Sequence, residues 1–449
     1  MNNRSVLAGL YSLWLVPCLF STVAAQSGKE TEETDSTPTS TEQGQTPMDS
    51  SFEPRDRATV VREERRQAFR DTDFYGELRT FYFDSDNLNG SHSEAGAIGG
   101  SAGLKTGYFR DLFAFGATAY TSQPINAPAD KDGTKLLEPG QHGYTVLGES
   151  YVDIRLADGV DASIGRKGFD TPFISRFDSR MTPNTFQGAL VQGSLGGDDG
   201  APGWRFGGGY IDQIKQRNSD EFVSMSAAAG AHAGVSRGVS VAGALYQKGS
   251  FSLGGIDYYS DDIINIGYFE AKDAFALTSR LSLKLAAQYT EQHSVGENLL
   301  MGHEYSARQI GTKIELAFAG ALLTAAYTSA GKTGTSIQSP WSGNPGYTSV
   351  QLEDFDRSGE TAWMARAAYN FPALRNLTAY ILYVQGSTPS TAGQYAHREY
   401  DLNLEWKASS AKWQALKLLA RYGHVWETGP EQLRANQLRL VLYYDPAWL

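Results

Sequence analysis

The sequence predicts an all-β protein, a transmembrane antiparallel β-barrel of about 18 strands with loops that fold inward. Three observations support this prediction. The chain holds 48 Gly, 24 Tyr and 21 Phe but only 20% charged residues, which is typical of β proteins. Apolar and polar side chains alternate over many separate segments, as expected for strands with one lipid-facing and one wet face. Short and long connections also alternate along the chain, a feature of barrels that cross a bacterial outer membrane.

The first 25 residues are predicted to be a secretory signal peptide. Arg4 precedes a long apolar stretch that ends in small residues, and we expect cleavage after Ala25. An uncleaved anchor helix is the alternative, against which Pro17 and the small residues argue. Cys18, the only cysteine, lies in this segment. The mature chain therefore has no thiol, which excludes disulfides and Cys-based metal or catalytic sites.

Residues 26–72 are predicted to be a disordered, acidic and charged periplasmic extension, followed by the barrel domain at 73–449. Positions 26 to about 54 are rich in Ser, Thr and Pro and have few large apolar side chains, so they bury too little surface to fold alone. The next stretch, "RDRATVVREERRQAFRDTD", spaces its charges as a helix would. We favour solvated chain over a short helix for it.

From residue 73 onward the pattern has a period of two, which predicts strands. In "RLSLKLAAQYTE", for example, leucines at 281, 283 and 285 alternate with polar residues. The predicted strands are about residues 73–83, 96–110, 112–122, 144–157, 159–169, 184–196, 203–214, 238–248, 250–259, 262–272, 275–290, 305–318, 320–330, 360–372, 375–388, 396–408, 413–425 and 434–445.

The connections between these strands indicate the architecture. Short turns are predicted near 110–112, 157–159, 249, 273, 319, 373–374 and 409–412. Longer loops are predicted near 84–95, 123–143, 170–183, 215–237, 291–304, 331–359 and 426–433. An even number of strands with short periplasmic turns and long external loops is typical of outer-membrane barrels, so we expect both termini in the periplasm. A soluble sandwich or propeller is the alternative, but strands of 14 to 16 residues are too long for a sandwich and no fixed repeat is present.

Cations on the strands are predicted to face the lumen. In "ALKLLARYGHVW" (415–426), Lys417 and Arg421 share one parity with Leu419 and Gly423, whereas the other parity carries no charge and holds Leu416, Leu418, Ala420 and Tyr422. A Lys or Arg facing hydrocarbon costs about 2–4 kcal/mol, so both must point into the pore. The same reasoning predicts a luminal basic ladder of Arg79, Lys105, Arg155, Lys284, Lys313, Arg366, Lys417, Arg421 and Arg439. Luminal acids are predicted at Glu77, Glu149, Asp153, Glu315, Asp401 and Glu405.

A row of cations along a pore attracts anions and passes them from site to site. Arginine binds a carboxylate with two parallel hydrogen bonds, which suggests small anionic or zwitterionic solutes that carry a carboxylate. The alternative is a set of mutually paired, solvated charges without a role in transport. For the cluster of Arg366, Lys417, Arg421 and Arg439 we favour a functional role.

The stretch "GRKGFDTPFISRFDSRMTPNTFQGALV" (165–191) resembles the third-loop region of the OprD family of substrate-specific outer-membrane porins. That region has a glycine–basic stretch, then "DTP", then "SRM-PNTF-G". These motifs correspond here to residues 165–167, 170–172, 179–181, 183–186 and 188. Further similarity lies at "LRTFYF" (78–83), "FGATAYTSQPINAP" (115–128), "VLGESYVDIRL" (146–156) and "ANQLRLVLYY" (435–444), so it spans about residues 73 to 445.

This resemblance implies an 18-stranded barrel whose third and seventh loops form a constriction, with a basic ladder facing an acidic pocket. It implies passive diffusion of small carboxylate-bearing solutes. Carried over to this chain, it makes Arg421 and Arg439 ladder residues. The third-loop residues that become candidates for the constriction are Asp170, Arg176, Asp178, Arg180 and Asn184, although Asn184 is also expected to shape the loop. Acids of the seventh loop that are candidates for the acidic wall are Glu353, Asp354 and Asp356.

Other functions fit the sequence less well. Seven histidines are present, but none has a nucleophile motif beside it, so we expect no enzyme. We expect no cofactor, no metal site and no nucleic-acid binding. An oligosaccharide-uptake or general diffusion porin is the alternative, with Tyr75, Phe81, Tyr151, Tyr246 and Tyr258 as the possible sugar path. The expected surroundings are outer-membrane lipid and lipopolysaccharide, and the expected state is a monomer or weak trimer.

Overall fold

The computed structural model describes residues 65–197, 201–374, 376–408 and 415–445. The predicted signal peptide and residues 26–64 lie outside this part of the chain. Residues 65–70, for which solvated chain was favoured, are helical, and the main-chain oxygen of Ala68 accepts a hydrogen bond from the Gly107 amide. This contact with the turn after the second strand gives the short helix a partner that the sequence pattern does not reveal.

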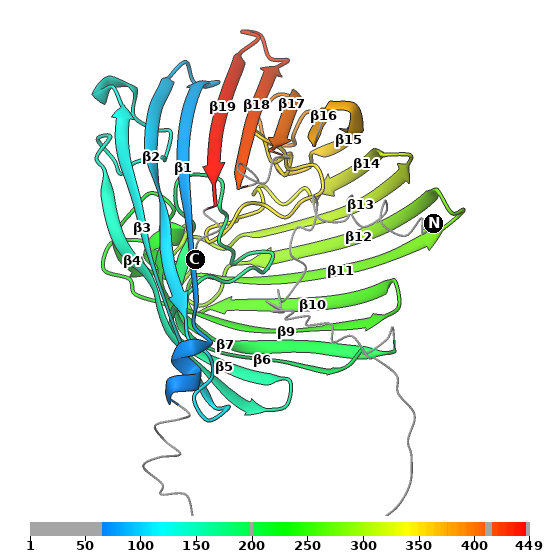
Figure 1. Ribbon diagram of the computed structural model, residues 1–449. Coiled ribbons are helices and arrows are strands. Elements are labelled where there is room, and N and C mark those ends of the chain that lie inside the picture. The colour runs from blue at the N-terminus through cyan, green and yellow to red at the C-terminus, as the bar shows by residue number, and fades with distance from the viewer. Residues whose placement is uncertain (1–64, 198–200, 375, 409–414, 446–449) are drawn as a thin grey trace, which may run out of the picture.

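The described residues form one antiparallel sheet that closes on itself (Figure 1). The strands are β1 (Asp73–Asp86), β2 (His92–Lys105), β3 (Phe113–Asn126), β4 (Tyr144–Ala157), β5 (Val160–Lys167), β6 (Thr185–Gly196), β7 (Gly203–Lys215), β8 (Phe222–Ser224), β9 (Val239–Lys248), β10 (Phe251–Ser260), β11 (Ile264–Ala276), β12 (Leu281–His293), β13 (Ser306–Phe318), β14 (Ala321–Ala330), β15 (Thr361–Phe371), β16 (Leu377–Gly386), β17 (His397–Lys407), β18 (Leu416–Glu427) and β19 (Arg434–Tyr444). The helical segments are η2 (Ala129–Lys131), α2 (Met225–Ala229) and η4 (Pro372–Leu374).

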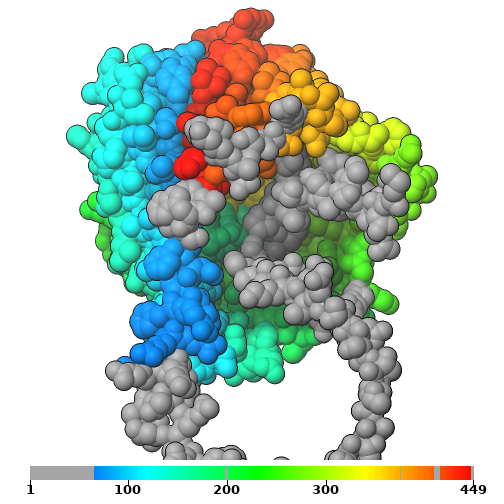
Figure 2. Space-filling view, in the orientation of Figure 1, coloured from blue at the N-terminus to red at the C-terminus, as the bar shows by residue number. Residues whose placement is uncertain are grey.

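The barrel closes between β1 and β19, which pair from Leu78 opposite Tyr444 to Asp86 opposite Asn436. Figure 2 shows the blue surface of β1 beside the red surface of β19 on one wall. The three-residue β8 adds to β7 within a loop, and β7 pairs with β9 to continue the wall. The barrel therefore has 18 wall strands, which confirms the predicted fold class and strand number.

Each predicted strand corresponds to a wall strand, and the differences lie at the ends. The turn predicted near residue 273 lies at 277–280, because β11 continues to Ala276 and Asp273 still pairs with Leu285 of β12. The second strand was predicted at 96–110 and lies at His92–Lys105. Alternation reveals which face a residue occupies, but hydrogen bonding to the neighbouring strand decides where pairing stops.

The two faces of the wall differ as the alternation predicts. On β1, Leu78 is 59% exposed on the outer face, whereas the neighbouring Arg79 is 4% exposed on the inner face. The outer face carries large apolar side chains on most strands, including Ile98, Phe115, Ile314, Leu323, Ile381 and Leu402. This is the distribution that a lipid-facing surface requires.

No helix among the described residues is long and apolar enough to cross a membrane.

Several loops fold into the barrel and pack against its inner face. We number them L2 (127–143), L3 (168–184), L4 (216–238), L6 (294–305) and L7 (331–360); Figure 1 shows L7 in yellow inside the barrel. Phe173 of L3, Met225 of L4 and Trp341 of L7 share one apolar cluster with the inner side chains of β6 to β13. Trp341 is fully buried, and its indole Nε1 donates to the Met225 carbonyl at 2.8 Å. The loops therefore pack together against the inner face of the wall and fill part of the barrel interior.

Candidate functional site

L3 is held in place by polar contacts at its start and within the loop. The Gly168 amide donates to Glu149 Oε1 at 2.7 Å, where the chain leaves β5. Arg176 forms an ion pair with Asp170 at 2.6 Å within the loop. Burial and the neighbouring carboxylates act in opposite directions on the Arg176 guanidinium, and the carboxylates, first that of Asp170, prevail and raise its pKa. These two predicted constriction residues therefore bind each other.

Arg79 of β1 anchors the middle of L3. Its guanidinium donates to both carboxylate oxygens of Asp178, at 2.7 and 2.9 Å, and to the main-chain oxygen of Arg180. It also binds Glu77 at 2.6 Å. Because every side of this 4% exposed group is occupied, Arg79 fastens the loop, and its luminal position alone does not make it available to a solute.

Arg180 and Asn184 connect L3 to neighbouring loops. The Arg180 Nε donates to the Thr134 carbonyl of L2 at 2.7 Å, and its guanidinium lies over the Phe83 ring. Burial, with the positive charges of Arg439 and Arg217, lowers the pKa of Arg180. The Asn184 side chain accepts from the Arg217 amide at 2.9 Å and donates to the Ser175 carbonyl at 3.2 Å. Asn184 therefore shapes the loop.

L3 and L7 meet inside the barrel. Ile174 of L3 and Trp341 of L7 form a parallel bridge, and the Ser175 and Ser342 hydroxyls lie 2.8 Å apart. Next to them, a Cβ atom on Gly343 would lie 2.6 Å from the Phe177 ring, so only glycine permits this approach. The two loops therefore hold each other in place inside the barrel.

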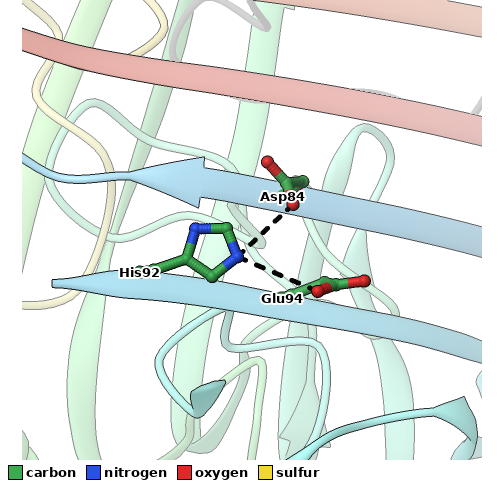
Figure 3. Close-up of side chains that lie close together, drawn as sticks. All are labelled: Asp84, His92 and Glu94. Carbon is green, nitrogen blue, oxygen red and sulfur yellow. Dashed lines mark ion pairs between the residues drawn. The ribbon is translucent and has the colours of Figure 1, made fainter.

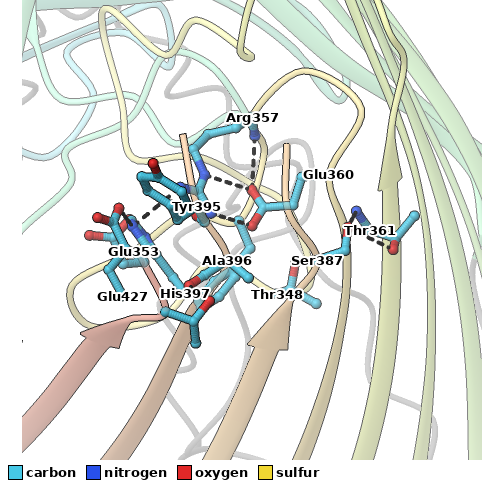
Figure 4. A network of polar contacts seen from close by, with 12 residues as sticks. Thr348, Glu353, Arg357, Glu360, Thr361, Ser387, Tyr395, Ala396, His397 and Glu427 are labelled. Atoms are coloured by element: carbon cyan, nitrogen blue, oxygen red, sulfur yellow. Dashed lines mark hydrogen bonds and ion pairs between the residues drawn. The ribbon is translucent and has the colours of Figure 1, made fainter. Parts of the chain in front are cut away.

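The tip of L7 is fastened to the inner face of β17. Asp401 accepts from the Gln351 amide at 3.2 Å, and Glu399 accepts from the Leu352 and Glu353 amides at 2.8 and 2.9 Å. His397, two residues further along the same face, contacts the Glu353 carboxylate at 3.0 Å (Figure 4). The predicted luminal acid Asp401 thus binds loop backbone.

Four cations remain on the wall formed by β15 to β19, and we call Arg366, Lys417, Arg421 and Arg439 the basic wall. Arg439 donates to Gln437 at 2.6 Å and to the Gln351 carbonyl of L7 at 3.0 Å. Arg421 donates to Asn403 at 2.8 Å, and Lys417 lies 4.0 Å from the centre of the Tyr443 ring. Arg366 lies over the Tyr380 ring at 4.4 Å. Arg421 and Arg439 are direct partners across β18 and β19.

The other predicted ladder residues lie beside acids. Lys105 binds Asp153 at 3.1 Å, and Arg155 lies 3.8 Å from Asp111. Lys313 lies 3.5 Å from Glu315, and Lys284 is the direct partner of Glu315 on the neighbouring strand. These cations are part of paired networks, which is the alternative that the sequence left open.

The three acids predicted for L7 have different surroundings. Glu353 binds His397, and Asp354 is exposed and accepts from the Ser349 hydroxyl at 2.5 Å. Asp356 is 8% exposed and accepts from Asn344 at 2.5 Å. Its burial, together with Asp354 and Glu360, raises the pKa of Asp356 to about 8. Of the three, Asp354 is the one whose side chain faces open space.

One group of side chains has the spacing that a metal ion needs, although the sequence predicted no metal site. His92 Nε2 lies 3.6 Å from Asp84 and 3.8 Å from Glu94 (Figure 3). Asp86 lies 2.8 Å from the other ring nitrogen, and the Lys131 ammonium binds Glu94. Asp86 and Lys131 therefore already contact His92 and Glu94 of this cluster. It lies at the loop end of β1 and β2, on the outer face of the sheet, whereas the basic wall lies on the inner face.

Sequence reasoning missed the polar network behind L7. Arg357 binds Glu360 at 2.6 Å, and His397 lies between Glu353 and Glu427 (Figure 4). The alternation in "HREYD" already places positions 397, 399 and 401 on one face. Their common partner comes from a loop more than 40 residues earlier, which no local pattern reveals.

Comparisons with known proteins agree with this architecture. A family model described as "outer membrane porin, OprD family" matches residues 67–448. No curated protein sequence matches the chain. The crystal structure of Pseudomonas aeruginosa OccK9 (OpdG) is 21% identical with a TM-score of 0.74, covering 84% of this chain and 99% of that one. P. aeruginosa OpdK with vanillate is 18% identical with a TM-score of 0.72 and the same coverage. Acinetobacter baumannii OccAB3 is 18% identical with a TM-score of 0.74, covering 84% and 100%.

Proposed function

The chain belongs to the OprD family of outer-membrane porins, and from this premise we propose that it passes small carboxylate-bearing solutes selectively by passive diffusion. Porins of this family are channels and not enzymes, and they reside in the bacterial outer membrane. Amino acids and aromatic or other organic acids are the solute classes we propose. The relative OpdK, crystallised with vanillate, is an example of a family member with an aromatic carboxylate.

The observation that carries this proposal is the pairing of Arg421 with Arg439 across two strands. Like charges directly opposite each other destabilise a sheet. Among the described residues, no carboxylate lies within ion-pair distance of either guanidinium, and their hydrogen bonds go to neutral oxygens. A solute carboxylate between the two arginines would relieve their repulsion and accept charge-assisted hydrogen bonds from both. Lys417 and Arg366 extend this positive path along the same wall.

The test is Arg421→Gln, measured by single-channel recording in a planar bilayer with added aromatic carboxylates. A hydrogen bond to a charged group contributes about 1.5–3 kcal/mol, so we expect the apparent carboxylate affinity to fall about tenfold or more. Anion selectivity should fall with it. The matched control is Arg155→Gln, because Arg155 lies beside Asp111 near a turn. If Arg421→Gln and Arg155→Gln give the same affinity and selectivity, the role of the basic wall is refuted.

The same recordings separate the alternatives. Block by oligosaccharides but not by carboxylates would indicate a sugar channel, and a large conductance indifferent to every solute would indicate a general diffusion pore. Of the aromatic residues considered for a sugar path, Phe81 is 3% exposed and Tyr258 is fully buried, where its hydroxyl contacts L3. These two side chains support the loops, which favours the carboxylate proposal. We further propose that the channel functions as a monomer or weak trimer within lipid and lipopolysaccharide.

A further inference from the structure

His397 begins β17 and points into the barrel with 6% of its surface exposed. Its Nδ1 lies 3.0 Å from Glu353 Oε2 of L7, and its Nε2 lies 2.8 Å from Glu427 Oε2 at the end of β18 (Figure 4). An ionised carboxylate only accepts hydrogen bonds, so both ring nitrogens must donate. Only the imidazolium form carries a proton on both nitrogens. The geometry therefore fits a positively charged His397.

The surrounding charges fit the same protonation state. Arg357 of L7 donates to both oxygens of Glu360, at 2.6 and 3.0 Å, and to the Tyr395 carbonyl at 2.9 Å. Its Nη1 also lies 3.2 Å from His397 Nε2, so Arg357 is a neighbouring positive charge that opposes the imidazolium, and the carboxylates of Glu353 and Glu427 at the two ring nitrogens must outweigh it. With an imidazolium, two cations face the three carboxylates of Glu353, Glu360 and Glu427. A neutral ring would leave one cation for three carboxylates and would turn a lone pair toward one carboxylate oxygen.

The Glu353 contact matters because Glu353 belongs to the fastened tip of L7. Its amide donates to Glu399 at 2.9 Å, while its carboxylate meets His397, so one residue is held at two points by β17. The adjoining Gln351 carbonyl accepts from Arg439 of the basic wall at 3.0 Å. Leu352 lies so close to Gly423 of β18 that an added Cβ would be 2.2 Å from it. Release of the Glu353 carboxylate therefore loosens the segment that lies against the basic wall.

We propose that His397, as an imidazolium, is a positioning residue that holds L7 across the channel, and that loss of its proton releases the loop tip and enlarges the pore. This inference rests on the proposed function, in which L7 forms part of the constriction. Glu353, Arg357, Glu360, Glu399 and Glu427 are the charged groups that set the proton equilibrium.

The experiment is single-channel KCl conductance of the wild-type protein in planar bilayers between pH 6 and pH 10. We expect a small conductance at pH 6 that rises in a step at alkaline pH. His397→Gln should show the larger conductance already at pH 6 and should lack the step. His303→Gln is the matched control, because His303 is an exposed L6 residue whose Nδ1 lies 3.0 Å from the Met301 carbonyl, and it should keep the wild-type profile.

Asp356 requires its own control because its raised pKa of about 8 lies in the same range. The alkaline step should persist in Asp356→Asn. If His397→Gln does not insert as a folded barrel, Glu353→Gln takes its place: it removes one partner, and conductance at pH 6 should rise. A flat wild-type profile, a step retained in His397→Gln, or an unchanged Glu353→Gln channel would overturn the proposal. Carboxylate block in the same bilayers reports on the proposed function separately, since it depends on Arg421.

Discussion

At the residue scale, Arg79 illustrates the difference between facing the lumen and being available there. Its parity places it inside, as the alternation predicts, yet two oxygens of Asp178, one of Glu77 and the Arg180 carbonyl surround its guanidinium. Arg421 also faces the lumen by its parity, but among the described residues its one hydrogen-bond partner is the neutral side chain of Asn403. The second arginine is therefore the better candidate to bind a solute.

Asp178→Asn tests the anchoring role of Arg79. Removing one partner of a buried ion pair costs up to about 3–5 kcal/mol, and less here because Asp178 is 41% exposed. We expect L3 to become mobile, which should increase conductance noise and mean conductance in single-channel recordings. Asp130→Asn, a change of the same kind at an exposed site in L2, is the control. Equal noise in the two variants would contradict the anchoring role.

At the element scale, the loops inside the barrel bind to side chains on the inner faces of the strands. β17 presents His397, Glu399 and Asp401 on one face, and all three bind the tip of L7. L3 in turn meets L7 through Phe177, whose φ of 41° is uncommon for a residue with a side chain. Arg217 of L4 lies over the Phe177 ring at 4.2 Å and limits its movement.

Gly343→Ala tests whether the L3–L7 contact narrows the channel. The new Cβ would lie 2.6 Å from the Phe177 ring, so the loops must separate, and we expect a larger single-channel conductance. Gly267→Ala on β11 is the matched control, because its nearest neighbours lie at 3.9 Å. No difference between the two alanine variants would show that this contact does not limit the current.

At the scale of the whole molecule, a chain with net charge -11 places the four cations of the basic wall on one side of its lumen. The 18 wall strands close through β1 and β19, which brings Arg79 near the basic wall although it lies at the other end of the sequence. Most of the acidic side chains of L3 and L7 bind other residues and thereby hold these loops in place. We expect the local field at the basic wall to differ in sign from the charge of the whole chain.

If the local field at the basic wall attracts the solute, a higher salt concentration should weaken solute binding. The Debye length falls from about 10 Å at 0.1 M to about 3 Å at 1 M ionic strength. We expect carboxylate block of the channel to become several-fold weaker over this range. A neutral aromatic solute of similar size serves as the control and should show no such change. Carboxylate block that is equally strong at both salt concentrations would argue against electrostatic capture.

The sequence by itself determined the fold class, the 18 wall strands and the parity of the luminal cations, because side-chain alternation is a local consequence of the pleated backbone. Its third-loop motif also indicated the family. Only the tertiary structure decided which luminal charges remain available. Arg79 meets Asp178 across 99 residues and Arg439 meets Gln351 across 88, so their partners depend on how the loops fold inside the closed barrel. That folding is a property of the whole chain, and no local pattern contains it.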